Sequence, residues 1–195
     1  MPDGTHAVIL EGLNVFRALE AWGARLYAAW AEGEADDHLR AGHLIIAERE
    51  ANHARLLAER IRALGGEPGP ACVDDVLARQ FDELSGICGL VAQLDALKAV
   101  TERDSAVLAG CQAALAAGFE ASRESDPATR QFWAALYGEE KVSGGWYRSK
   151  YSELSGRRAR TQDLPLLAPA QVNRRAVGAS FTGGAPAACA ATTRI

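Results

Sequence analysis

The segment Glu50-Ala51-Asn52-His53 could bind a metal ion through two of its side chains. It lies inside a long stretch of helical periodicity, and helix residues three apart share one face about one turn apart. Glu50 and His53 can therefore offer a carboxylate oxygen and an imidazole nitrogen to the same point. Because Glu-x-x-His also arises by chance on charged helices, further carboxylates at the same height are needed to predict a site.

The spacing of apolar residues predicts four helical stretches that could supply those carboxylates. The expected helices cover about residues 6–33, 37–64, 82–119 and 126–154. Residues 65–82 begin with Gly-Gly-Glu-Pro-Gly-Pro, which cannot continue a helix. The sequence therefore predicts an all-α protein in which two antiparallel hairpins are joined by one crossover link, a known four-helix-bundle topology.

Two pairs of glutamates are expected to lie at one height in these hairpins. With the first turn centred on Ala35, Glu20 lies 15 residues before it and Glu50 lies 15 after it, and both are then roughly 22 Å from the turn. Glu102 and Glu140 are likewise centred within a few residues of the second turn. Four carboxylates at one height in an apolar bundle repel each other unless cations neutralise them. Two divalent ions would balance the charge, and oxygen ligands with one imidazole suit iron or manganese.

The composition and charge of the chain favour a soluble helical body followed by a tail of different character. The 195 residues are 48% hydrophobic but only 7% aromatic, and the net charge is −4. Residues 156–195 hold six arginines against one aspartate, which leaves −9 on the rest. We therefore expect a bundle over 1–155 and a disordered Arg/Pro/Gly-rich tail over 156–195, with Leu164-Pro165-Leu166-Leu167 as an alternative docking segment.

The same features exclude several classes of partner. An acidic body argues against nucleic acid, since binding phosphates needs a basic face. The four cysteines are widely spaced without a Cys-x-x-Cys pair, so we expect free thiols. The chain shows no signal-like segment and no run of about 20 apolar residues, and a cytoplasmic protein with no membrane partner is expected.

With these motifs the chain resembles the ferritin-like superfamily, nearest to its rubrerythrin and bacterioferritin-type members, over about residues 10–154. In that family one helix of each hairpin supplies a Glu and the other a Glu-x-x-His, and together they bind two metal ions. The similar motifs here are Leu19-Glu20 with Tyr27, Glu50-x-x-His53, Glu102-Arg103-Asp104-Ser105-Ala106 and the segment from Gly138 to Trp146. The last departs from the family pattern, because Ser143 stands where the second histidine is expected.

The resemblance implies a non-haem carboxylate protein with two irons, or manganese, per chain. Its implied metal ligands are Glu20, Glu50, His53, Glu102 and Glu140. The implied activity is that of an oxidase, oxygenase or peroxidase that uses oxygen or peroxide, on a small organic substrate, with an external electron donor. We also expect a homodimer. The alternatives are an iron-storage protein and a ferritin-like scaffold whose degenerate site acts only through protein contacts.

Ser143 leaves two interpretations of the site open. A neutral hydroxyl is a poor ligand, so water, Glu139 or nothing would take the place of the second histidine. The result is either an open coordination position beside a pocket or a decayed site that binds one metal ion or none.

Three further side chains are expected near the site. Tyr27 lies seven residues after Glu20, and His43 lies seven residues before Glu50, so the two are expected at the same height in the hairpin. Their position predicts either a hydrogen-bonded layer above the metal or a satisfied core pair. Arg17 lies level with His53 by the same counting and is a candidate neighbouring cation.

Overall fold

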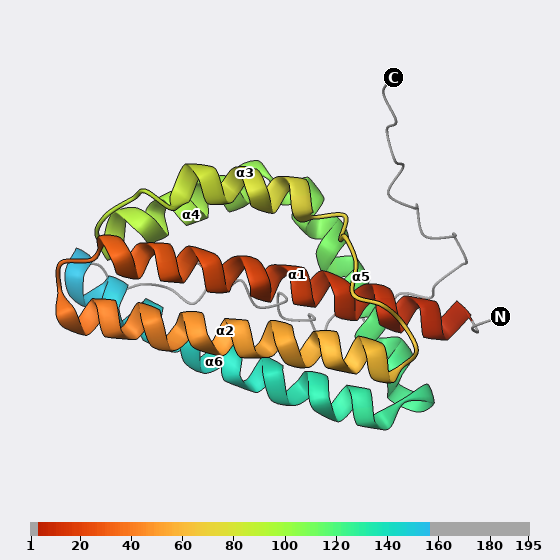
Figure 1. Ribbon diagram of the computed structural model, residues 1–195. Coiled ribbons are helices and arrows are strands. Elements are labelled where there is room, and N and C mark those ends of the chain that lie inside the picture. The colour runs from red at the N-terminus through yellow and green to blue at the C-terminus, as the bar shows by residue number, and fades with distance from the viewer. Residues whose placement is uncertain (1–3, 157–195) are drawn as a thin grey trace, which may run out of the picture.

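The first two helices form a long antiparallel hairpin (Figure 1). The computed structural model describes residues 4–156, in which α1 covers Gly4–Gly33 and α2 covers Asp37–Ala63. The side chain of Asp36 accepts hydrogen bonds from the backbone N–H groups of His38 and Leu39. Such a cap stabilises a helix start by about 1 kcal/mol. The cap fixes where α2 begins and allows a turn of only a few residues.

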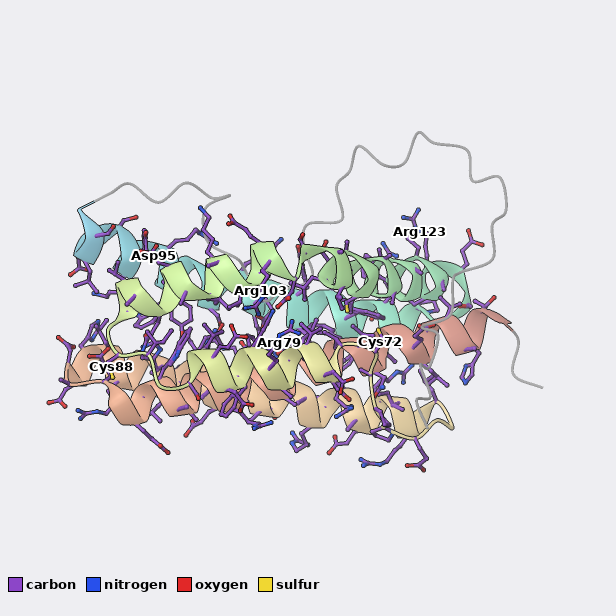
Figure 2. All side chains as sticks on the ribbon, turned by 90° about the horizontal axis from the view of Figure 1, so that it is seen from above. Cys72, Arg79, Cys88, Asp95, Arg103 and Arg123 are labelled. Atoms are coloured by element: carbon purple, nitrogen blue, oxygen red, sulfur yellow. The ribbon has the colours of Figure 1, made fainter. Side chains whose placement is uncertain are left out.

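Two shorter helices connect this hairpin to the second half of the chain. α3 covers Asp74–Leu84 and α4 covers Leu90–Arg103, and Figure 2 shows them side by side with Arg79 and Arg103 close to each other. Both arginines bind Asp104, the residue that follows α4, at 2.6 and 2.9 Å. This ion-pair network ties the end of α4 to α3.

The last two helices meet at a single residue. α5 covers Ser105–Ser125 and α6 covers Pro127–Ser155. Asp126 between them accepts a hydrogen bond from the backbone N–H of Thr129 and forms an ion pair with Arg60 of α2 at 2.8 Å. Pro127 is favourable at the first helical position, where its missing N–H costs nothing. Asp126 therefore caps the start of α6 and also holds it against the end of α2.

The apolar core is organised around α1, which packs against α2, α3 and α5, while α6 packs against α2, α4 and α5. In Figure 1, α2 lies between α1 and α6. The largest fully buried side chains include Trp30, Phe16, Leu13 and Leu26 of α1 and Leu57 and Ile61 of α2. One face of α1 thus lies entirely within the protein, and Glu20 lies on that face.

The all-α prediction is confirmed over the described residues, but the third predicted helix differs. The helix expected over 82–119, for which a break near Ser85-Gly86 and Gly89 was an alternative, is divided into the end of α3, then α4 and α5. The first break contains Gly89, whose positive φ of 84° is easily adopted only by glycine. At the second break Asp104 is held by Arg79 and by Gln80 of α3. The predicted tail over 156–195, including its docking segment, lies outside the described residues except for Gly156.

Within residues 4–156, none of the helices combines the length and the apolar character that crossing a lipid bilayer requires.

The crossing of α1 and α5 predicts a sharp response to one added methyl group. A Cβ at Gly12 would lie 2.8 Å from the Trp133 ring and 3.0 Å from the backbone oxygen of Ala114. We expect Gly12→Ala to lower the free energy of unfolding, measured in urea, by about 1–3 kcal/mol through overpacking. Gly138→Ala is the matched control, since nothing lies within 4 Å of its Cβ position. It should raise stability by up to about 1 kcal/mol, and equal effects at the two positions would contradict the close crossing.

Candidate metal centre

Four ionisable side chains from three helices meet in the interior. Glu20 comes from α1, Glu50 and His53 from α2, and Glu140 from α6, and each is at most 4% exposed. Ionisable groups are rarely buried to this extent unless they are paired or bind a metal. The convergence of Glu20, Glu50, His53 and Glu140, called the carboxylate cluster below, therefore needs a physical explanation.

His53 is the centre of this cluster. Its Nδ1 lies 3.0 Å from Glu20 Oε2 and 3.1 Å from Glu140 Oε1. Ligand atoms of these three residues all lie within 4.8 Å of one another, which is close enough for one ion to contact them all. On the other side of the ring, Nε2 lies 3.1 Å from Glu139 Oε2. When Glu139 accepts the Nε2 proton, the lone pair of Nδ1 points at the two carboxylates, which is the tautomer that a metal ligand requires.

The hydrogen bonds of the cluster leave one oxygen unpaired. In the other tautomer, with a proton on Nδ1, His53 can donate only one hydrogen bond from that nitrogen, and it goes to Glu20. Glu140 Oε1 is then buried without a hydrogen-bond partner, although it lies close to the same nitrogen. A buried acceptor without a partner costs about 1–3 kcal/mol, and more when it is charged. A cation contacting Glu20, His53 and Glu140 would satisfy this oxygen.

A glycine on α1 makes room for the fourth group. A Cβ at Gly23 would lie 3.1 Å from Glu50 Oε2 and 3.6 Å from two carbons of the same side chain. Glu50 therefore extends over a position where α1 carries no side chain. Because Gly23 lies three residues after Glu20, the two share a face of α1 and place both carboxylates together.

Burial controls the protonation of the acids. Removal from water raises the pKa of Glu20 well above its ordinary value, and repulsion from Glu140 raises it further. Removal from water also raises the pKa of Glu50, with repulsion from Glu20 and Glu140 adding to it. Glu50 donates a hydrogen bond to Glu20, which places the shared proton on Glu50. Without a cation the cluster thus binds protons where a metal would otherwise lie.

The pKa of His53 is raised although the residue is buried. Burial lowers its pKa, but the nearby carboxylates of Glu140 and Glu139 favour the protonated ring and outweigh that effect, so the pKa of His53 is raised. Imidazolium formation is another way to neutralise the acids when no cation is present. The cluster therefore favours any positive charge at its centre, whether proton or metal ion.

Ser143, at the expected place of the second histidine, is buried and accepts a hydrogen bond from Arg49 Nη1 at 2.7 Å. The guanidinium therefore takes the side of the cluster where a second imidazole was expected from the family pattern. Arg49 was not anticipated from the sequence, although it directly precedes Glu50. Its positive charge disfavours a second metal ion on that side.

The aromatic layer next to the cluster has a different pairing from the predicted one. His43 Nδ1 lies 2.9 Å from the hydroxyl of Tyr147, not of Tyr27. The ring of Tyr27 packs against Tyr147 with 5.2 Å between centroids. Tyr147 follows Glu140 by seven residues, as Tyr27 follows Glu20, and this repeated spacing is the signal that could have indicated it.

Two of the predicted site residues lie elsewhere. The side chain of Glu102 is 69% exposed and faces Lys98 of its own helix at 3.9 Å. Arg17 donates hydrogen bonds to Asn14 and to the backbone oxygen of Gly69, and so ties α1 to the crossover link and not to His53. The structure thus brings together Glu20, Glu50, His53 and Glu140 but neither Glu102 nor Arg17.

The position of the second turn explains the difference for Glu102. The turn was expected over residues 122–127, and α5 and α6 do meet there, at Asp126, but Glu102 and Glu140 are centred on residue 121 and not on Asp126. Glu140 lies 14 residues after Asp126, and the residue 14 before it is Gln112 of α5. A shift of 10 residues is about 15 Å along a helix. The buried neighbours of Gln112 are Cys111 and Leu115, so this part of α5 offers the cluster no carboxylate.

Comparisons of the chain with protein-family models, with curated proteins and with solved structures find no match.

The raised pKa values predict how the stability of the metal-free protein depends on pH. Above pH 4.5 the unfolded chain has released carboxyl protons that folded Glu20 and Glu50 retain, and above pH 6.5 the same holds for His53. Folding then binds protons, so stability falls as pH rises. In chelator, we expect the midpoint of thermal unfolding to fall from about pH 5 to about pH 8. The lowered pKa values of Asp104 and Asp126 act below that range. The lowered pKa of His43, about 4, opposes the fall below pH 6.5, but by one proton against the two of Glu20 and Glu50.

Glu50→Gln should flatten this profile and raise the midpoint at the alkaline end, because it removes one acid that must stay protonated when buried. Glu102→Gln changes an exposed acid and should leave the profile unchanged. A midpoint that rises with pH in the unaltered protein would contradict the assignment.

Proposed function

We propose that this chain is a ferritin-like metalloprotein that binds an iron or manganese ion in the carboxylate cluster and uses it in oxidase, oxygenase or peroxidase chemistry. One observation carries the proposal: Glu20, His53 and Glu140 are buried with their ligand atoms within 4.8 Å of one another, and one of these atoms lacks a hydrogen-bond partner. The arrangement of α1 and α2 as one hairpin and of α5 and α6 as another supports the ferritin-like part of the proposal.

The donor set favours iron or manganese over other metals. Three carboxylates with one imidazole form a mostly hard, oxygen-rich site without thiolates. The three ionised acids would carry three negative charges in a poorly solvated interior, and a divalent cation removes most of that repulsion. The same charge balance disfavours a neutral ligand or an anion in this position.

One ion per chain fits the side chains better than two. Glu102, which the family resemblance implies as a ligand, is exposed, and Ser143 is occupied by Arg49. The second half of a two-ion site would therefore lack a carboxylate and an imidazole and would lie beside a guanidinium. We propose a mononuclear site in which the missing ligands leave coordination positions open.

The residues of the cluster and its neighbour Glu139 would have different roles around such an ion. Bound there, iron or manganese would supply the electrons that reduce oxygen or peroxide. Glu139 holds the proton of His53 Nε2 and keeps Nδ1 free as a ligand atom. Because the side chain of Glu139 is 57% exposed, this hydrogen bond also connects the buried imidazole to solvent. Glu50 and Glu20 can exchange their shared proton when the charge at the centre changes.

A second candidate, a scaffold with a degenerate site, is favoured by the hydrogen bonds within the cluster. Glu50 donates to Glu20 and His53 Nδ1 bonds to Glu20, so protons alone satisfy much of the cluster. In that case the chain would act through protein contacts and bind no metal. Iron storage, the other alternative, has no specific observation in its favour.

Metal analysis after purification and reconstitution separates these candidates. We expect about one iron or manganese per chain, and we expect Glu140→Gln and His53→Ala to weaken binding by at least about tenfold, as loss of a ligand or its supporting group does. Glu102→Gln is the matched control and should leave the metal content unchanged. Unchanged content in the two cluster variants would contradict the site, and a metal-free chain equally stable in chelator would favour the scaffold. Two ions per chain would contradict the mononuclear site and favour the two-ion arrangement of the ferritin-like superfamily.

Gly23→Ala tests the site without removing a ligand. The added methyl group would push against Glu50 Oε2, since their separation would be 3.1 Å. We expect roughly tenfold weaker metal binding, measured by titration calorimetry, because a displaced carboxylate loses its ligand geometry. Gly110→Ala is the control, since nothing lies within 4 Å of that position. Equal affinities in the two variants would exclude Glu50 from the ligands.

A further inference from the structure

An arginine next to the carboxylate cluster carries a charge that no acid balances. Arg49 of α2 is half-buried, and its Nη1 donates a hydrogen bond to the hydroxyl of Ser143 of α6 at 2.7 Å. A guanidinium carries five N–H donors, and this bond uses one of them. Within residues 4–156 no carboxylate forms an ion pair with Arg49, although Glu50 directly follows it. A neutral hydroxyl therefore holds the guanidinium in place and leaves its charge available to an anion.

The other arginines of α2 show that this pairing is unusual. Arg40, Arg55 and Arg60 each form an ion pair with a carboxylate, at 2.6 to 2.8 Å. Arg62 is exposed in the last turn of the helix, where a positive charge interacts favourably with the helix dipole. Arg49 alone among the arginines of α2 is held in mid-helix against a neutral partner.

Two contacts fix the register of α2 against α6, which lie next to each other (Figure 1). The ring of Trp146 lies against Gly42, where a Cβ would overlap it. Further along, Ser143 lies against Arg49. Residue numbers thus rise along α2 as they fall along α6, so the two helices are antiparallel here. The seven residues from Gly42 to Arg49 span about 10 Å.

Two exposed apolar side chains lie within this span. Ile45 is 59% exposed and Val142 is 63% exposed. Ile45 lies three residues after Gly42 and four before Arg49, so it shares the edge of α2 that borders α6. Val142 lies four residues before Trp146 and shares the edge of α6 that borders α2. Adjoining exposed apolar side chains, unlike scattered ones, are typical of a contact site.

We propose that the outer side of the α2–α6 junction binds a small aliphatic monocarboxylic acid. The residues of this junction are Ile45, Arg49, Val142, Ser143 and Trp146. The carboxylate of the ligand accepts hydrogen bonds from the remaining donors of Arg49, and its aliphatic body lies over Ile45 and Val142 toward Trp146. The span of about 10 Å suits an extended acid of about eight carbons.

The charges at the junction select this class of ligand. The planar fork of a guanidinium matches a carboxylate and binds it with two parallel hydrogen bonds. A neutral ligand would leave Arg49 without a counterion, and a cation would be repelled by it. Glu139, whose side chain is 57% exposed, lies one turn before Val142 on the same edge of α6 and disfavours a polyanion such as a phosphate ester. One cation beside an apolar strip therefore favours a single carboxylate with an apolar body.

The test uses the full chain in chelator and octanoate as the probe, followed by nuclear magnetic resonance. Because none of the junction contacts requires a metal ion, binding in chelator separates this proposal from that of the metal centre. We expect saturable binding with a Kd of about 0.1–1 mM. The methyl signals of Ile45 and Val142 and the indole signal of Trp146 should shift together. Leu44, which is 46% exposed but lies off the edge that borders α6, should not shift.

Two pairs of variants test the head and the body of the ligand separately. Arg49→Gln should weaken octanoate binding at least about tenfold, because it removes the charge-assisted hydrogen bonds, whereas Arg55→Gln, which changes an exposed arginine of the same helix, should not. Ile45→Ser should weaken octanoate binding roughly fivefold through lost apolar contact and leave the weaker binding of acetate unchanged. Leu44→Ser is its matched control and should alter neither.

Several outcomes would overturn the proposal. These are no saturable binding of octanoate by the unaltered protein below about 10 mM, equal binding of octanoate and octylammonium, and equal losses in Arg49→Gln and Arg55→Gln. Shifts that centre on Leu44 instead of Val142 would also overturn it. Octanoate binding by a chain that takes up no metal would support this site while contradicting the proposed metal centre.

Discussion

The central constraint on this structure is the cost of holding three carboxylates in an interior from which water is excluded. Glu20, Glu50 and Glu140 repel one another there, and only protons or cations relieve that repulsion. The surrounding groups are arranged to supply positive charge or hydrogen-bond donors: His53 between two acids, a shared proton between Glu20 and Glu50, and Arg49 at the margin. A cluster with one unsatisfied oxygen is a compromise that a metal ion resolves better than protons can.

Close helix contacts make this arrangement possible. At four helix positions a glycine allows a neighbouring group to lie where a side chain would otherwise be: Gly23 beside Glu50, Gly42 beside Trp146, and Gly12 and Gly118 at the crossing of α1 and α5. Each glycine in a helix interior costs roughly 1 kcal/mol relative to alanine. Two of these four glycines lie next to the carboxylate cluster or to the His43–Tyr147 hydrogen bond, and the other two allow the close crossing of α1 and α5.

The sequence predicted one half of the site because one turn could be located well. Gly33 and the capping Asp36 define the α1–α2 turn, and equal distances from it place Glu20 level with Glu50. For the other half, the turn was located at 122–127, but the break at Asp104 was not, because it depends on contacts with Arg79 and Gln80 that are distant in sequence. Glu140 was still predicted, since it lies on the buried face of a helix, but its partner was not.

The two halves of the protein are consequently unequal, and this inequality shapes what the site can do. The α1–α2 hairpin supplies three of the four cluster residues, whereas α6 supplies one and α4 and α5 contribute none. In place of a second set of ligands, α6 contributes Ser143 to Arg49 and Tyr147 to His43. The side of the cluster that a symmetric bundle would use for a second metal ion thus holds a fixed positive charge and a hydrogen-bonded tyrosine.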